Sequence, residues 1–445
     1  MHCIVIVGGG ASGTILLINL LRKSPKPLVV KVIEKNEEVG RGVAYAPLAG
    51  DYLLNVPSSK MGLYAETVDD FFNWLLQNGY DYKGSDFVPR RIYGDYLVAR
   101  LKEELSLHPQ HEVTFIRDEV TDIEPGEGYE VHLASGERIY AREVVLAVGN
   151  YPPRPVAAEH NRVYNDPWTN GFWEKLNPED TVVLLGTGLT AIDFVNELNR
   201  RKHTGKIRML SRHGKLPWPH EEPCMQGLLK GYFSTEDSLR TVITKINAIK
   251  RHPLLKIVRP VCVIEELRNL FPRMWYHWSN EERDLFYRRL FPIWNINRHR
   301  IPPAVETIIK ELVQAGQLEI LSGSLKEVVP GEEQVKISYS RRQDKELVSV
   351  TAHHFLNCTG PECNFDRLKS PLTRNLLSRG IIETDGLKTG LLSNSRLQLK
   401  SGGEIKQHLW SIGPPLKSMF FESTAIHEIR NQANALSNYI INQLS

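Results

Sequence analysis

Glycines in two stretches of the sequence have the spacing that binds the pyrophosphate of a dinucleotide. In the first stretch, IVIVGGGASG, Gly8, Gly10 and Gly13 follow an apolar run in GxGxxG spacing. The first glycine permits a tight turn, the second lets the backbone approach the phosphates, and the third lets a helix pack against a strand. Ala11 and Ser12 then stand at the start of that helix, where free N–H groups face negative charge.

An acidic residue stands where a ribose needs a hydrogen-bond acceptor. Glu34 lies twenty-one residues after Gly13, at the end of the second β-branched run, and Lys35 follows it. A carboxylate at this offset accepts hydrogen bonds from ribose hydroxyls. The glycine motif, its flanking elements and the acid together predict a first dinucleotide site.

The second stretch, VVLLGTGLTA, repeats the pattern with Gly186, Gly188 and Ala191. At the offset that holds Glu34 in the first unit, this unit has Arg212, preceded by Ser211. An arginine suits a 2′-phosphate, whereas an acid suits NAD. The second site is therefore predicted to bind NADP(H), with the helix start contributing Leu189 and Thr190.

The elements that must position these motifs alternate between apolar runs and helical patterns, which predicts an α/β fold with two Rossmann-like domains. We expect an FAD-binding domain from residues 1–170 and 345–445, interrupted by an NAD(P)H-binding domain at 171–344. Within the latter, aromatic residues gather at helical spacing from about 225 to 303, which predicts a helical insert whose rings form a core.

The amino-acid composition limits which partners the protein is expected to bind and where in the cell it is expected to be. The net charge of +3 is too balanced to favour nucleic acid or an anionic membrane, and no apolar run is long enough to span a bilayer. Five cysteines, without zinc spacing, predict no disulfide framework and no metal site. The N-terminus lacks the basic start of a signal peptide, so a cytoplasmic location is expected. Cys358 and Cys363 have a spacing that some redox flavoproteins use, but a redox pair is the weaker interpretation.

Blocks along nearly the whole chain resemble the FAD-NAD(P)-binding protein family (YdhS-like), and more distantly the class B flavoprotein monooxygenases. The blocks include GRGVAY at 40–45, LLNVPSSKM at 53–61, NCTGP at 357–361 and ESTAIHEIRNQA at 422–433. This resemblance implies a two-dinucleotide flavoprotein with FAD in the first site and the reduced nicotinamide in the second. The nicotinamide must then meet the flavin for hydride transfer.

The resemblance also implies roles for single residues. Arg41 and Gly42 would lie at the FAD pyrophosphate. Asn55 would hydrogen-bond to the edge of the flavin ring and Met61 would pack against its face, or both residues would belong to the hydrophobic core. Four further positions are assigned to FAD in the same way: Val120, Gly149, Gly360 and Gly413.

The C-terminal block is predicted to act on the flavin through a helix start. Ser423 or Thr424 would cap a helix whose positive end stabilises an anionic reduced flavin. Glu422 would contact ring or ribityl groups, or would simply favour the helix start. Pro414 replaces the acid that many such flavoproteins carry after Gly413, so the anchoring of the ribityl chain differs here.

Polar residues near the insert have two interpretations each. Arg298, His299 and Arg300 would reach an anionic substrate or the NADP(H) end, or would form a solvated turn. His220 would be a loop histidine or a nicotinamide contact. No Ser/His/Asp or Cys/His set is visible, as expected where the cofactor carries the chemistry.

The leading hypothesis is an NADPH-dependent FAD monooxygenase that uses O₂ to oxygenate a small amine or sulfur nucleophile. The alternatives are an NAD(P)H-dependent flavin reductase or oxidase, and a nucleotide-binding sensor. A homodimer is compatible with the composition.

Overall fold

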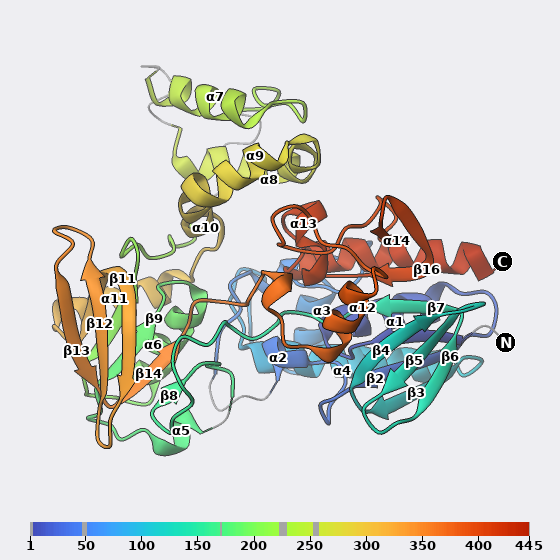
Figure 1. The fold of residues 1–445 in the computed structure, drawn as a ribbon, viewed down its shortest axis with the longest axis horizontal. Coiled ribbons are helices and arrows are strands. Elements are labelled where there is room, and N and C mark those ends of the chain that lie inside the picture. The colour runs from blue at the N-terminus through green and yellow to red at the C-terminus, as the bar shows by residue number, and fades with distance from the viewer. Residues whose placement is uncertain (1–2, 47–50, 170, 222–228, 252–257, 445) are drawn as a thin grey trace.

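Two domains built on sheets lie side by side, with a group of helices beside them (Figure 1). The computed structural model describes residues 3–46, 51–169, 171–221, 229–251 and 258–444.

Six strands form the sheet of the first domain: β1 (Cys3–Val7), β2 (Val29–Glu34), β3 (Glu112–Arg117), β7 (Glu143–Leu146), β15 (Gln398–Ser401) and β16 (Glu404–Ser411). Their order is β15-β16-β7-β1-β2-β3, and all neighbours run parallel except β15, which is antiparallel to β16. β1 is an almost wholly buried apolar run, and β7 is buried throughout and apolar after Glu143, as expected of a parallel sheet covered on both faces.

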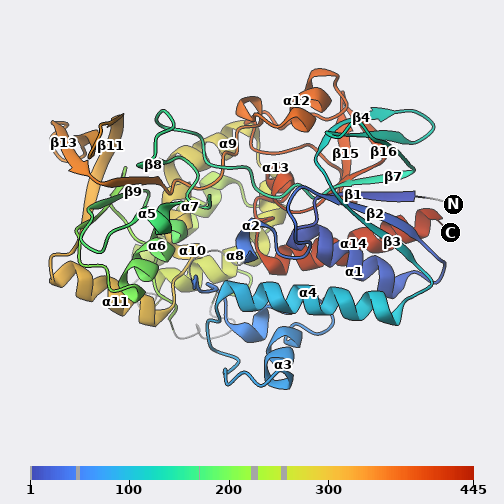
Figure 2. The ribbon, with the colours of Figure 1, turned by 90° about the horizontal axis from the view of Figure 1, so that it is seen from below.

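Helices and a small antiparallel sheet cover the first domain. The helices are α1 (Ala11–Lys23), α2 (Gly42–Tyr45), α3 (Asp70–Gln77), α4 (Arg90–Leu107), α12 (Pro371–Ser378), α13 (Lys417–Phe420) and α14 (Ile426–Leu444). The small sheet contains β4 (Val120–Pro125), β5 (Tyr129–Leu133) and β6 (Arg138–Ala141). α1 packs against both α4 and α14, and these helices lie together in Figure 2.

Seven strands form the sheet of the second domain: β8 (Val163–Tyr164), β9 (Val182–Leu185), β10 (Ile207–Ser211), β11 (Leu318–Pro330), β12 (Val335–Arg341), β13 (Leu347–Ala352) and β14 (His354–Asn357). Their order is β13-β12-β11-β10-β9-β14-β8. β8, β14, β9, β10 and the start of β11 are parallel, while β11, β12 and β13 are antiparallel. Its helices are α5 (Phe172–Lys175), α6 (Leu189–Arg200) and α11 (Pro303–Gln314).

Strand pairing corrects the predicted domain boundaries. β8 at 163–164 and β13 and β14 at 347–357 belong to the second sheet, although the sequence assigned them to the first domain. The reason is that β14 pairs directly with β9, the first strand of the second glycine unit. Residue 170, the predicted first boundary, lies outside the described residues.

The helical insert leaves the second domain after β10 and returns at α11. It contains α7 (Leu239–Arg251), α8 (Pro260–His277), α9 (Asn280–Leu285), one π-helical turn at Phe286–Leu290, and α10 (Phe291–Arg298). Its aromatic residues form a buried core, which confirms that prediction, and Phe421 of the first domain joins that core. The predicted start of the insert near residue 225 lies outside the described residues.

Among the described residues, no helix is both long and apolar enough to cross a bilayer.

The cysteines differ in their bonding state. Cys262 is disulfide-bonded, which the cysteine count did not predict, while Cys3, Cys358 and Cys363 are free thiols.

Candidate functional site

The first glycine turn connects β1 to α1 without room for side chains. Gly8 has a φ of +107°, and its N–H donates to the carbonyl of Ile33 at 2.8 Å. A Cβ on Gly8 would overlap the carbonyl oxygen of Ala147, and one on Gly13 would overlap the carbonyl oxygen of Gly8. The turn therefore requires glycine for both the tight bend and the close helix packing.

The loop at residues 40–42 lies directly on this turn. The N–H of Gly40 donates to the carbonyl of Gly9 at 2.7 Å, and a Cβ on Gly42 would come within 3.1 Å of the Gly10 Cα. Arg41, in contrast, forms ion pairs with Glu38 and Asp95, both at 2.7 Å. Its charge is thus already compensated by two carboxylates, a pairing that the pyrophosphate role assigned to Arg41 did not include.

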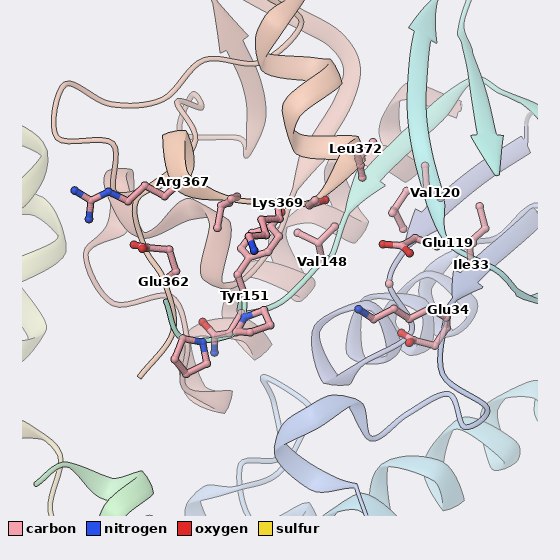
Figure 3. Close-up of a pocket in the computed structure, with 18 of the residues that line it drawn as sticks. Ile33, Glu34, Glu119, Val120, Val148, Tyr151, Glu362, Arg367, Lys369 and Leu372 are labelled. Atoms are coloured by element: carbon pink, nitrogen blue, oxygen red, sulfur yellow. The ribbon is translucent and has the colours of Figure 1, made fainter. Parts of the chain in front are cut away.

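A cavity of about 400 Å³ opens at the carboxyl ends of β1 and β2. Four of the predicted FAD residues line it: Gly8, Glu34, Lys35 and Val120. Figure 3 shows Glu34, Ile33 and Val120 on one side of the cavity and Tyr151 toward the other. The Glu34 carboxylate accepts hydrogen bonds from the N–H of Gly9 at 2.8 Å and of Asn36 at 2.9 Å. The backbone therefore holds this acid at the cavity edge.

A smaller cavity, of about 50 Å³, shares Asn150 and Tyr151 with the larger one. Gly149 and Thr424 line it. Next to Thr424, Ser423 is fully buried, and its Oγ has no hydrogen-bond partner. A buried hydroxyl without a partner is rare in folded proteins and is explained when a bound group supplies that partner.

The remaining glycines of the first site also adopt left-handed backbone conformations. Gly413 has a φ of +81°, and a Cβ there would lie 2.7 Å from Ser12 Oγ at the start of α1. Gly360 has a φ of +85°, with open space where its Cβ would be. The glycines, the cavity and the unpartnered Ser423 hydroxyl together fit a bound FAD.

Two of three residues predicted near the flavin, Glu422 and Met61, have side chains that are engaged elsewhere. Both carboxylate oxygens of Glu422 accept from Arg298 Nε at 2.9 Å, so this acid joins the insert to the first domain instead of pointing freely into a site. Met61 is buried in the core of the first domain. His220 Nε2 donates to the backbone carbonyl of Asn55 at 2.9 Å, a bond that does not use the Asn55 side chain.

The ion pair with Glu422 also rules out one of the interpretations of Arg298, that of a solvated turn. Arg298 is largely buried and is not part of a solvated turn. His299 lies beside it, and its pKa is lowered to about 3, mainly by burial and in addition by the positive charges of Arg298 and Lys417. For His220, burial is also the main reason that the pKa is lowered.

The second glycine turn repeats the geometry of the first. Gly186 has a φ of +124°, its N–H donates to the carbonyl of Leu210 at 2.7 Å, and a Cβ there would overlap the carbonyl oxygen of Cys358. Space is open where a Gly188 Cβ would be, just before α6 begins with Leu189 and Thr190. The start of α6 is therefore accessible to a phosphate.

Ser211 holds the loop that carries Arg212. Its Oγ accepts from Thr187 Oγ1 and from the N–H of Gly214, both at 3.0 Å. Ser211 thus connects the glycine turn to the end of β10, and Arg212 extends from there into a second cavity.

This second cavity, of about 410 Å³, has a cationic lining. Arg212, His213, Lys326, Arg342 and Lys345 line it together with two serines, and no carboxylate is among the lining residues. Arg342 Nη1 contacts His213 Nδ1 at 2.6 Å. Burial lowers the pKa of His213, and Arg342 and Arg212 lower it further, so the neutral ring accepts this hydrogen bond.

Sequence reasoning found Arg212 but missed Lys326, Arg342 and Lys345. These three side chains come from β11, the end of β12 and the turn that follows it, more than a hundred residues after Arg212. No local spacing connects them to the glycine motif. The pairing of β10 with β11, and of β11 with β12, brings them together.

The two cysteines that follow β14, Cys358 and Cys363, lie in different surroundings. Cys358 is buried, and burial raises the pKa of its thiol. Cys363 lines the smaller cavity, where Lys417 Nζ lies 3.7 Å from its Sγ. Both are free thiols.

Comparison with known families agrees with this arrangement. Residues 5–151 match the family model described as FAD-NAD(P)-binding, which includes the first glycine turn, Glu34 and Val120. This match shows that the N-terminal part of the first domain is similar to FAD-NAD(P)-binding domains. Curated proteins, compared in the same way, give no match.

Solved flavoprotein structures share the fold over the whole chain. The ornithine N-hydroxylase of Kutzneria sp. 744, solved with reduced FAD, NADP⁺ and L-ornithine, is 15% identical with a TM-score of 0.69, and all of both chains is covered. The L-lysine 6-monooxygenase of Pseudomonas syringae is 13% identical with a TM-score of 0.67, again over all of both chains. Thioredoxin reductase of T. acidophilum is 12% identical with a TM-score of 0.52 over the same coverage. The chain therefore has the two-domain fold of these flavoproteins.

Proposed function

Starting from a first domain whose N-terminal part is similar to FAD-NAD(P)-binding domains, we propose that the protein is an NADPH-dependent FAD monooxygenase acting on a small amine or sulfur nucleophile. The observation that carries this proposal is the presence of two different glycine turns in one chain. The first lies beside the carboxylate of Glu34, and the second lies in the domain that holds the cationic cavity. One chain then holds FAD and NADP(H) in separate sites.

Each site supplies binding and orientation. Glu34 accepts hydrogen bonds from the FAD ribose, and Ser423 Oγ gains the partner that it lacks in the protein alone. Arg212, Arg342 and Lys345 bind the 2′-phosphate that distinguishes NADPH from NADH. Bound FAD supplies the redox chemistry: it accepts two electrons and a proton from NADPH and delivers them to O₂.

The overall reaction balances with four reactants. NADPH, a proton, O₂ and the nucleophile give NADP⁺, water and the oxygenated product. The neighbours named for ornithine and lysine hydroxylation support an amine as the nucleophile. Disulfide reduction receives less support, because the buried Cys358 is disfavoured as a thiolate and is not bonded to Cys363.

Stopped-flow spectroscopy of the FAD-loaded protein tests this function. Without oxygen, we expect NADPH to bleach the flavin absorbance much faster than NADH does. With oxygen, L-ornithine, L-lysine or dimethyl sulfide is added, and NADPH consumption, hydrogen peroxide and oxygenated product are measured together.

The outcomes separate the functions. Oxygenated product formed in proportion to NADPH supports the monooxygenase. Fast flavin reduction that yields only hydrogen peroxide contradicts it and supports a reductase or oxidase. A flavin that neither nucleotide bleaches contradicts both enzymes and supports a sensor.

A further inference from the structure

Arg90 and Asp193 form an ion pair across the two domains. Arg90 begins α4 of the first domain, and Asp193 lies in α6 of the second. Arg90 Nη2 is 2.8 Å from Asp193 Oδ2, and the two side chains are only 18% and 12% exposed. The pair is therefore largely shielded from water and from screening by salt.

On the first-domain side, Arg90 also holds the segment that leads to the flavin region. Its N–H donates to the carbonyl of Tyr52 at 2.7 Å, and its Nε donates to the carbonyl of Leu53 at 3.1 Å. Asn55 follows two residues later and contacts His220 of the second domain. Movement of Arg90 would thus shift this segment.

On the second-domain side, the same segment contacts α6 and its surroundings. The Tyr52 ring lies 5.4 Å from the Trp168 ring and 5.8 Å from the Phe194 ring, centroid to centroid. Tyr52 Oη accepts from Trp173 Nε1 at 3.1 Å. Aromatic contacts therefore join the segment that Arg90 holds to the second domain.

Short stretches of chain connect this contact to both cofactor sites. Asp193 lies one helical turn after Leu189 and Thr190, at the end of α6 where the proposed function places the NADP(H) pyrophosphate. Leu53 lies two residues before Asn55. On the basis of the proposed function, we propose that Arg90 and Asp193 are positioning residues that set the approach of the nicotinamide to the flavin.

The physical reason is the steep dependence of hydride transfer on geometry. Reacting atoms must lie about 3–3.5 Å apart, and a displacement of about 1 Å can slow a reaction by about 100-fold. Loss of the pair frees α6 to shift relative to the segment at 51–54. The nucleotide still binds, because the residues around the cationic cavity and the glycine turn are unchanged.

The test compares Asp193→Asn, Arg90→Gln and their double variant with the wild-type holoenzyme. Asn matches the shape of Asp193 and removes a charge that burial disfavours: burial raises the pKa of this carboxyl to about 6 despite Arg90. We therefore expect this variant to fold, which circular dichroism and FAD content will verify.

Two readouts are measured on each variant. In anaerobic stopped flow, we expect the limiting rate of flavin reduction to fall at least about 10-fold, while the Kd for NADPH changes less than about 3-fold. In the protein without cofactors, we expect faster hydrogen exchange at residues 51–54 and 189–200. The double variant should be no slower than Arg90→Gln, because both changes break one contact.

A matched pair inside the first domain serves as the control. Arg100 and Asp70 are also 2.8 Å apart and 14% and 15% exposed. We expect Arg100→Gln and Asp70→Asn to leave the limiting rate and the exchange at 51–54 and 189–200 unchanged. If they lower the rate as much as the interdomain variants do, the positioning role is wrong.

Failure of the inference is distinguishable from failure of the proposed function. An unchanged limiting rate in Asp193→Asn, with wild-type flavin reduced by NADPH, overturns the positioning role alone. If NADPH does not reduce wild-type flavin, the proposed function fails. Unchanged hydrogen exchange in the variants then overturns the interdomain role as well.

Discussion

Gly8 and Gly186 occupy equivalent positions in two separate sheets. Each N–H donates to the next strand of its sheet, at 2.8 Å to Ile33 and 2.7 Å to Leu210. Each lacks the room for a Cβ because a carbonyl oxygen lies in its place, that of Ala147 for Gly8 and that of Cys358 for Gly186. The same substitution at the two positions therefore tests the two sites independently.

Gly8→Ala is expected to lose FAD, whereas Gly186→Ala is expected to keep FAD but lose reduction by NADPH. Both changes force alanine into a left-handed conformation that costs about 1–3 kcal/mol, in addition to the overlap. FAD content by absorbance and anaerobic reduction by NADPH are the measurements. Gly126→Ala, at a turn with open space, is the control and should change neither. Equal FAD loss in both glycine variants would contradict separate sites.

Arg342→Gln and Lys345→Gln are each expected to weaken NADPH binding about 10-fold and NADH binding less than 2-fold. The reason is that these side chains line the cationic cavity, and a tenfold loss corresponds to about 1.4 kcal/mol for a lost charge contact. Isothermal titration with both nucleotides measures this difference. Lys336→Gln provides the comparison, because Lys336 is exposed on β12 but does not line the cavity. A parallel loss of NADH affinity would place the 2′-phosphate elsewhere.

Phe421→Ala is expected to lower the free energy of unfolding by about 3–5 kcal/mol. The Phe421 ring lies 4.8 Å from those of both Phe271 and Trp275, so truncation leaves a cavity between the insert and the first domain. Urea unfolding followed by tryptophan fluorescence gives the value. Tyr276→Ala, an aromatic of α8 that is 59% exposed, should change it by less than about 0.5 kcal/mol. Similar losses in the two variants would argue against the docking role of Phe421.

The protein is expected to lose stability as the pH falls below about 6.5, in part through His299. Its pKa is about 3 in the folded state, below the ordinary value of 6.5, so the unfolded chain binds the proton first. The free energy of unfolding therefore decreases between pH 6.5 and pH 3. Urea midpoints at several pH values should show a shallower decrease in His299→Gln. His277→Gln, at an exposed position of α8, should follow the wild type; an unchanged slope in His299→Gln would contradict this assignment.

Local patterns in the sequence were sufficient for the glycine turns and the strands around them. Gly8, Gly186 and Arg212 directly follow a strand and Glu34 is the last residue of one, so their positions along the chain determine which end of the sheet they occupy. That the first domain binds FAD and the second binds NADP(H) remains a prediction.

Contacts between distant residues were not predictable in this way. Arg298 pairs with Glu422, and Arg90 with Asp193, across more than a hundred residues each. Lys345 joins Arg212 in the cationic cavity for the same reason. Spacing along the chain carries no signal for such pairs, since they depend on how separate elements pack together.

The strand order of the first sheet determines when each domain can be completed during synthesis. β16 at 404–411 pairs with β7, and α14 packs against α1, so the first domain needs the last part of the chain. The second sheet needs only residues 163–357. On the ribosome, the second domain can thus fold while the first still exposes β7 as an open edge. During this interval, the exposed edge of β7 in a newly made chain can pair with the edge of another chain. The interval ends when β16 has been synthesised and pairs with β7.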